Sequence, residues 1–132
     1  MKNLAGITAR YIDRPFSDFG CIELVARLLD DIGTPLPAEV NGIDQVNYHL
    51  LVDLDIKAAQ NTMLEIFSNI GCKGDSRYPS IGNLLVIEQP GDVYFPAVYV
   101  GGGQAIASFV KKGVCVFNID NHNRVCLCRR LD

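Results

Sequence analysis

The sequence lacks two features that would assign it to a large class of proteins at once. It has no excess of basic residues, since 12 Lys and Arg stand against 15 Asp and Glu. Nucleic acids and acidic membrane surfaces are therefore not expected as partners, because both bind a clustered Lys/Arg face. It also has no apolar run long enough to cross a membrane, and Arg10, Asp13 and Arg14 interrupt the N-terminus before a secretory signal could form. We therefore expect a protein that is cytoplasmic when synthesised.

Histidine is scarce, and the cysteines are odd in number. An odd set cannot pair completely, and most of these residues lie in apolar runs, which is typical of reduced thiols. The five cysteines are Cys21, Cys72, Cys115, Cys126 and Cys128. The two histidines are His49, in an apolar segment, and His122, among turn-forming residues. A structural role is expected for His49 and a solvated role for His122.

Helical spacing comes first along the chain. Over residues 21–32 the apolar residues recur at steps of three and four, which predicts a helix with Ser17 or Asp18 as its N-cap. The same spacing predicts a second helix over residues 55–70. The segment 46–54 between them is ambiguous between a short strand and a helix.

Short β-rich runs come second, from residue 83 onward. They are LLVI, VYFPAVYV, QAIASFV, GVCVFNI and RVCLCRRL, and they are separated by turns such as VGGG, KKG and DNHN. Turns of this length leave no room for crossover helices, so the strands are expected to be antiparallel. The order predicts one α+β domain over residues 1–132, with N-terminal helices followed by a five-stranded antiparallel sheet.

Cys21 is the cysteine in a distinctive position, because the first predicted helix begins with it. The positive end of the helix dipole and the unpaired N–H groups stabilise a thiolate there and can hold an oxyanion. An ordinary small buried residue at a helix start explains the position equally well without any chemistry. A nucleophilic role also requires a base close in space, and only His49 and His122 are available.

The remaining cysteines raise the question of a metal site. Cys126 and Cys128 are two residues apart, so a regular strand would place both sulfurs on one face, with Cys115 on a neighbouring strand. Zinc sites usually use Cys-x-x-Cys pairs at turns, so buried packing is favoured and no metal or other cofactor is expected. A metal site made of these cysteines and His122 stays open as an alternative.

Two blocks, RPFSDFGCIELVARLLDDIGTPLP and GNLLVIEQPGDVYFPAVYVGGGQAIAS, together resemble a known family. They are similar to the NlpC-like family of papain-fold cysteine peptidases, which cut peptide stems of bacterial cell walls, and especially to the versions found in phage tails. The family has an Asp-Cys-Ser-Gly-Leu-Val helix start, then a Gly-Asp-Leu-Val strand and a His-Val-Ala-Ile-Tyr-Val-Gly strand. The matching residues include Gly20, Cys21, Leu24, Val25, Gly82, Leu84, Leu85, Ala97, Val98, Tyr99, Val100 and Gly101.

The resemblance places Cys21 at the family's nucleophile but leaves it without partners. The catalytic histidine falls on Phe95 and the third, polar residue on Ala107, and neither side chain can accept a proton or orient an imidazole. The family's tyrosine beside the site falls on Phe16. The resemblance therefore implies a papain-like NlpC-type domain that has lost peptidase activity and serves as a binding or structural module. Its expected partners are cell-wall peptides or phage-tail proteins, the latter in a virion-associated setting of prophage origin.

The alternative is an active cysteine hydrolase that cleaves a peptide or amide bond of peptidoglycan. In it, His49 or His122 would replace the missing base of Cys21 from another position in the fold. An imidazole nitrogen within roughly 4 Å of the Cys21 sulfur would support this alternative. Apolar surroundings at Phe95 and Ala107 would count against it.

Overall fold

The computed structural model describes residues 4–40 and 42–132, and within its third helix the side chains at positions 45–47 and 49 lie outside the description. The described helices are α1 (Leu4–Thr8), α2 (Cys21–Asp31), α3 (Gln45–Leu54) and α4 (Ile56–Ser68). The described strands are β1 (Cys72–Lys73), β2 (Leu84–Gln89), β3 (Val93–Gly101), β4 (Gln104–Phe109), β5 (Gly113–Asn118) and β6 (Arg124–Arg130). None of the helices in this part of the chain has both the length and the apolar character needed to span a bilayer.

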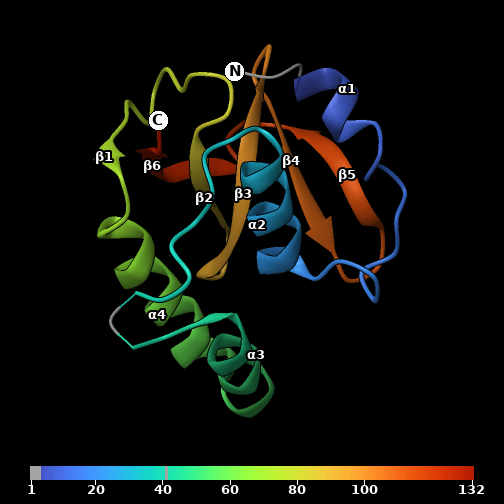
Figure 1. Cartoon of the computed structure of the whole chain (residues 1–132). Helices are drawn as coiled ribbons and strands as arrows, with labels where there is room; N and C mark the ends of the chain where they lie inside the picture. The colour runs from blue at the N-terminus through green and yellow to red at the C-terminus, as the bar shows by residue number, and fades with distance from the viewer. Residues whose placement is uncertain (1–3, 41) are drawn as a thin grey trace.

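The strands form one antiparallel sheet in the order β1-β6-β2-β3-β4-β5. The α+β class, with helices first and an antiparallel sheet second, is thereby confirmed (Figure 1). The strand count is six rather than five, because the two residues of β1 pair with the end of β6. The DNHN segment is not a hairpin turn as predicted, since β6 pairs with β2 and not with β5.

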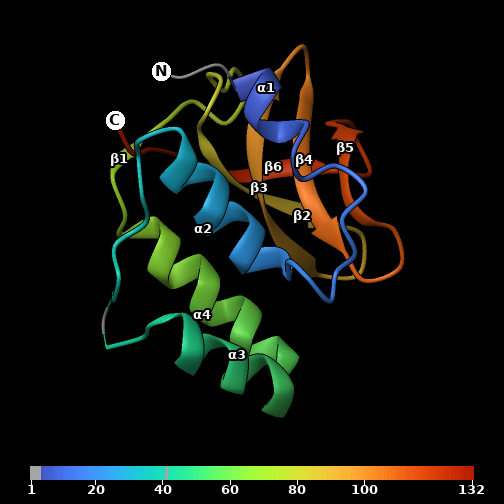
Figure 2. The same cartoon turned by 45° about the vertical axis from the view of Figure 1, so that its right-hand side comes forward.

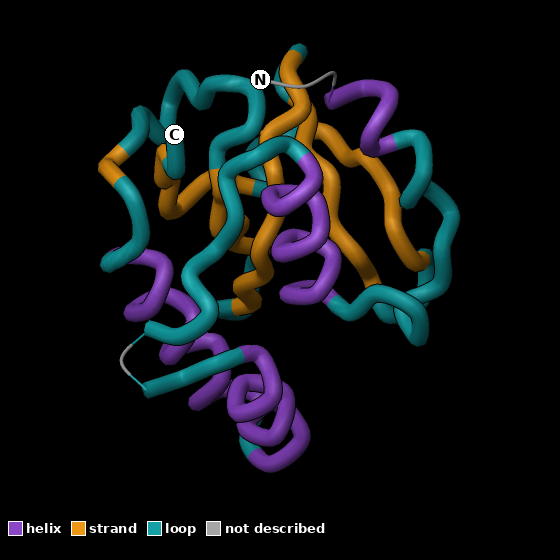
Figure 3. Tube along the Cα trace, in the orientation of Figure 1, coloured by secondary structure: helices purple, strands orange, loops and turns teal. Residues whose placement is uncertain are grey.

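The helices gather on one face of the sheet, which we call the helix face. α2 packs against β3 and β4, and α3 and α4 lie side by side below it (Figures 1 and 2). Figure 3 shows α2 in front of the strands and α3 and α4 below them. Four apolar residues of α2 are completely buried there against alternate residues of the strands. The main contributors are Leu24, Val25, Leu28 and Leu29 from α2 and Leu84, Val86, Val98, Ile106 and Val114 from the sheet.

The other face of the sheet, which we call the aromatic face, carries a separate core. It contains small and aliphatic residues together with three phenylalanines whose rings meet edge to face. Its members include Leu85, Ile87, Ala97, Ala105, Ala107, Phe95, Phe109 and Phe117. The segment after β5 crosses the strands to reach β6, and the Ile119 N–H donates to the Gly103 carbonyl on the way. The sheet is correspondingly curved (Figure 2).

The helix boundaries follow from local chemistry. α4 begins after Asp55, whose side chain accepts a hydrogen bond from the Ala58 N–H at 3.1 Å. α2 begins after Gly20 without a side-chain cap, so the predicted caps Ser17 and Asp18 are wrong. Asp18 instead pairs with a guanidinium in the loop before the helix. The ambiguous segment 46–54 is helical and lies within α3.

Candidate functional site

Cys21 is the first residue of α2, and the loop before it is fastened to the sheet. The Phe19 carbonyl accepts a hydrogen bond from the Ser108 hydroxyl of β4. The guanidinium groups of Arg14 and Arg27 lie 5.2 and 5.8 Å from the centre of the Phe19 ring. These contacts fix the end of α2 that carries the thiol against the helix face.

The surroundings of Cys21 favour the neutral thiol. Burial raises the pKa of Cys21 above its ordinary value, and the nearby charge of Glu23 adds to the rise. Backbone N–H groups of Ile22 and of Cys21 itself oppose the rise, as expected at a helix start, but they do not outweigh burial. The dipole effect predicted from the sequence is therefore present but smaller than the cost of removing the thiolate from water.

Tyr48 of α3 is a buried side chain near this end of α2. Its exposed fraction is 7%, and burial raises the pKa of its hydroxyl; a thiolate at the nearby Cys21 would raise this pKa further. Tyr48 and Ile22 line the same pocket of about 50 Å³, between the start of α2, the segment 36–44 and the two lower helices. Asp44 is the charged residue of an otherwise mainly apolar lining. Sequence reasoning missed Tyr48, because the segment that contains it had no clear periodicity.

The structure does not bring Phe95 or Ala107 next to Cys21. Both belong to the aromatic face, where the Phe95 ring lies 5.2 Å from the ring of Phe109 and Ala107 pairs with Cys115 of β5. The expectation that they line the site from the sheet is corrected, because successive strand residues point to opposite faces. The surroundings of both residues are apolar.

Other residues of β3 and β4 face the helices. Pro96 pairs with Val86, which lies in the core under the helices, and Ser108 pairs with Val114 in the same core. Tyr94 also packs on this side, and its hydroxyl donates to the Glu88 carboxylate at 3.0 Å. Of these side chains, only the serine and the tyrosine are polar, and both are engaged in hydrogen bonds.

His122 lies on the side of the sheet opposite Cys21. It belongs to the segment between β5 and β6, where its backbone N–H donates to Asp120 at 2.9 Å. It lines a surface hollow together with Cys115, Phe109 and Phe117. Phe109 and Phe117 belong to the aromatic face, so the sheet stands between this imidazole and the Cys21 thiol.

His49 is in α3, next to Tyr48, but its side chain lies outside the described residues. Its prediction as a relocated base therefore stays a prediction. Its backbone lies in α3, the helix that also carries Tyr48.

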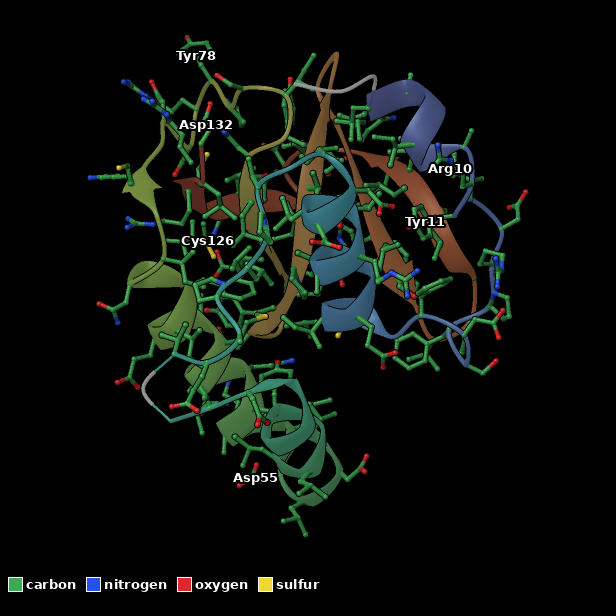
Figure 4. All side chains as sticks on the ribbon, viewed as in Figure 1. Arg10, Tyr11, Asp55, Tyr78, Cys126 and Asp132 are labelled. Carbon is green, nitrogen blue, oxygen red and sulfur yellow. The ribbon has the colours of Figure 1, made fainter. Side chains whose placement is uncertain are left out.

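The three cysteines considered for a metal site are not brought together. β5 and β6 are separated by β2, β3 and β4, so Cys115 is not on a strand next to Cys126 and Cys128 as predicted. The pairing of β6 with β2 shifts register between Val86 and Ile87. This bulge breaks the alternation, so Cys126 is exposed while Cys128 is buried. Figure 4 shows Cys126 at the side of the sheet away from β5. Across the described residues, no three His, Cys, Asp or Glu side chains are grouped as metal ligands would be.

Comparison with known proteins gives a likeness to solved structures but no match in sequence. No protein-family model matches the sequence, and no curated protein matches it. The crystal structure of an NlpC/P60 family protein from Bacillus cereus ATCC 10987 superposes with a TM-score of 0.60 at 14% sequence identity. The fold is NlpC/P60-like. The match covers 97% of this chain but 39% of the Bacillus protein. This NlpC/P60-like chain thus corresponds to less than half of that protein, and its activity has to be argued from its own site.

Proposed function

We propose that this protein is a non-catalytic NlpC/P60-like domain that acts as a binding or structural module. The observation that supports the proposal is the state of Cys21, a half-buried thiol whose pKa is raised by burial. The histidine whose side chain is described, His122, lies across the sheet from it. A thiol without a base is mostly protonated near neutral pH and reacts slowly with carbonyl groups.

The ligand that fits the proposal is a cell-wall peptide or a segment of a phage-tail protein. The pocket beside the start of α2 is mainly apolar, with Asp44 and Tyr48 as polar residues of its lining. A volume of about 50 Å³ suits a small aliphatic side chain rather than a ring. A prophage origin and a place in the virion belong to this proposal.

The first experiment measures the rate at which iodoacetamide alkylates each cysteine between pH 5 and pH 10, by peptide mass spectrometry. Cys72 is the matched control, since it is exposed on the short strand β1. We expect the inflection of the Cys21 rate to lie at higher pH than that of Cys72, because burial disfavours the thiolate. An inflection of Cys21 below that of Cys72 would contradict the proposal, since it requires a cation beside the sulfur.

Shielding of Cys21 by Tyr48 is tested in the same assay. Tyr48→Ala removes a buried ring close to Cys21, so alkylation of Cys21 is expected to become faster at neutral pH if that ring shields the thiol. Tyr48→Phe is the matched control, because it keeps the ring and removes only the hydroxyl. If both variants leave the Cys21 rate unchanged, Tyr48 does not cover the thiol and the assignment of its environment is wrong.

The hydrolase is the second candidate, and the position of α3 is the observation that favours it. α3 carries His49 next to Tyr48, and Tyr48 lies close to Cys21. The test is release of soluble fragments from purified peptidoglycan by the wild type, by Cys21→Ser and by His49→Ala. No release by the wild type supports the binding module, whereas release that both substitutions abolish establishes the hydrolase.

A further inference from the structure

A second site lies at the open end of the aromatic face, away from Cys21. A hollow of about 460 Å³ is found where the turn between β4 and β5 meets the segment between β5 and β6. This volume falls within the range of small-molecule sites, which in β-rich folds often occur at the mouth of a curved sheet. Its lining includes Phe109, Phe117, Cys115, Lys111, Lys112 and His122.

The floor of the hollow is aromatic and firmly packed. Phe109 and Phe117 are half-buried, with ring centres 5.6 Å apart at an angle of 81°. Phe95 lies behind them, 5.2 and 5.7 Å from the two rings. Rings held by each other in edge-to-face contact present fixed surfaces, on which another flat ring can pack at little entropic cost.

The rim of the hollow is positive, although the whole chain has a net charge of −3. Lys111 and Lys112 lie in the exposed turn between β4 and β5, and His122 lies in the segment between β5 and β6. No carboxylate is among the lining residues. Asp120, next to His122 in sequence, already accepts the N–H groups of His122 and Asn123 at 2.9 and 2.8 Å.

We infer that this hollow binds a small aromatic carboxylate. The ring of the ligand packs on Phe109 and Phe117, and its carboxylate accepts hydrogen bonds from Lys111, Lys112 and the His122 imidazole. Besides burial, the Asp13 carboxylate is close enough to raise the pKa of the Cys115 thiol, but Lys112 acts on the same thiol more strongly than Asp13 in the opposite direction. With Lys111 beside Lys112, an anionic group is therefore favoured over an ammonium. This inference is independent of the proposed function, because the sheet separates the hollow from Cys21.

Cys115 provides a reporter, since its thiol lines the hollow. Phenylacetate is added as the probe, and alkylation of Cys115 is followed at pH 8.5 with Cys72 as the internal unprotected thiol. At a concentration ten times the dissociation constant, about one site in eleven is free, so Cys115 alkylation is expected to slow about tenfold. Phenylethanol, which has the ring without the charge, is expected to protect much less. Titration calorimetry with both compounds gives a second measure if Cys115 reacts too slowly.

The variants distinguish recognition of the carboxylate by the two lysines from nonspecific shielding of Cys115. Lys111→Ala combined with Lys112→Ala alters only exposed side chains, and it is expected to abolish protection by phenylacetate. Lys73→Ala on β1 removes one exposed charge at the other edge of the sheet and is expected to leave protection intact. Equal protection by phenylethanol, equal protection in the double variant, or no binding of phenylacetate at 10 mM in either assay would each overturn the inference.

Discussion

The contact between β5 and the loop before α2 is expected to be sensitive to a single methyl group at Gly113. This glycine has φ of +72°, and a Cβ atom added to it would overlap the Arg14 carbonyl oxygen and lie 3.3 Å from the Pro15 Cα. Both obstacles are backbone atoms, so no side chain can rotate away to make room. Gly113→Ala must therefore push the loop off the edge of the sheet.

The magnitude follows from what that movement breaks. The loop is held by two hydrogen bonds of 2.9 Å, from the Asp13 N–H to the Val114 carbonyl and from the Val114 N–H to the Arg14 carbonyl. Their loss costs about 1–3 kcal/mol in total, and the left-handed conformation of a non-glycine residue adds about 1–2 kcal/mol. Gly113→Ala is thus expected to lower the free energy of unfolding by about 2–5 kcal/mol.

Gly102→Ala is the matched control for this prediction. Gly102 has φ of +61°, and a Cβ there meets no atom within 4 Å, so only the conformational cost of about 1–2 kcal/mol applies. Urea denaturation followed by circular dichroism measures both variants. Equal losses in the two variants would refute the reasoning, because the contact with Arg14 would then carry no energy.

Three further predictions concern the cap, a surface carboxylate and the core. Asp55→Ala removes the N-cap of α4 at the free end of the helix pair (Figure 4) and should cost about 1 kcal/mol in thermal unfolding, with Asp55→Asn nearly unchanged. The Glu88 pKa is lowered by hydrogen bonds from Tyr94 and then Arg124, so its stabilisation is present above the ordinary carboxyl pKa and lost as pH falls through the lowered value. Glu88→Gln should flatten this part of the acid denaturation curve, and an unchanged curve would contradict the assignment. Leu28→Ala, in the completely buried face of α2, should cost about 2–5 kcal/mol in urea denaturation, and a loss below about 1 kcal/mol would show that α2 is loosely packed.

Much of the fold could be predicted because its elements have strong local patterns. The apolar spacing of α2 and α4 and the β-rich runs of β2 to β6, bounded by turns, are properties of neighbouring residues. The partner of β6 could not be predicted, because strand pairing depends on residues distant in sequence. β1 has two residues and thus no period to recognise.

Of the candidate site, only the position of Cys21 could be predicted from the sequence. Cys21 at the start of a helix follows from local spacing, and the structure has it there. The orientation of Phe95 and Ala107 did not follow, because a shift of one residue in a strand exchanges its two faces. Tyr48 was missed for a related reason, since the face that α3 presents to Cys21 is set by packing against α4 and not by the pattern within α3.

The pairing of β6 with β2 also dictates the order in which the protein can be completed during synthesis. β2, β3, β4 and β5 follow one another and can pair as they leave the ribosome, whereas β2 keeps an open edge until residues 124–130 have emerged. That edge carries the completely buried residues Leu85, Val86 and Ile87. An apolar strand edge without its partner recruits other chains, so premature termination before β6 should yield an aggregation-prone product rather than a smaller soluble protein.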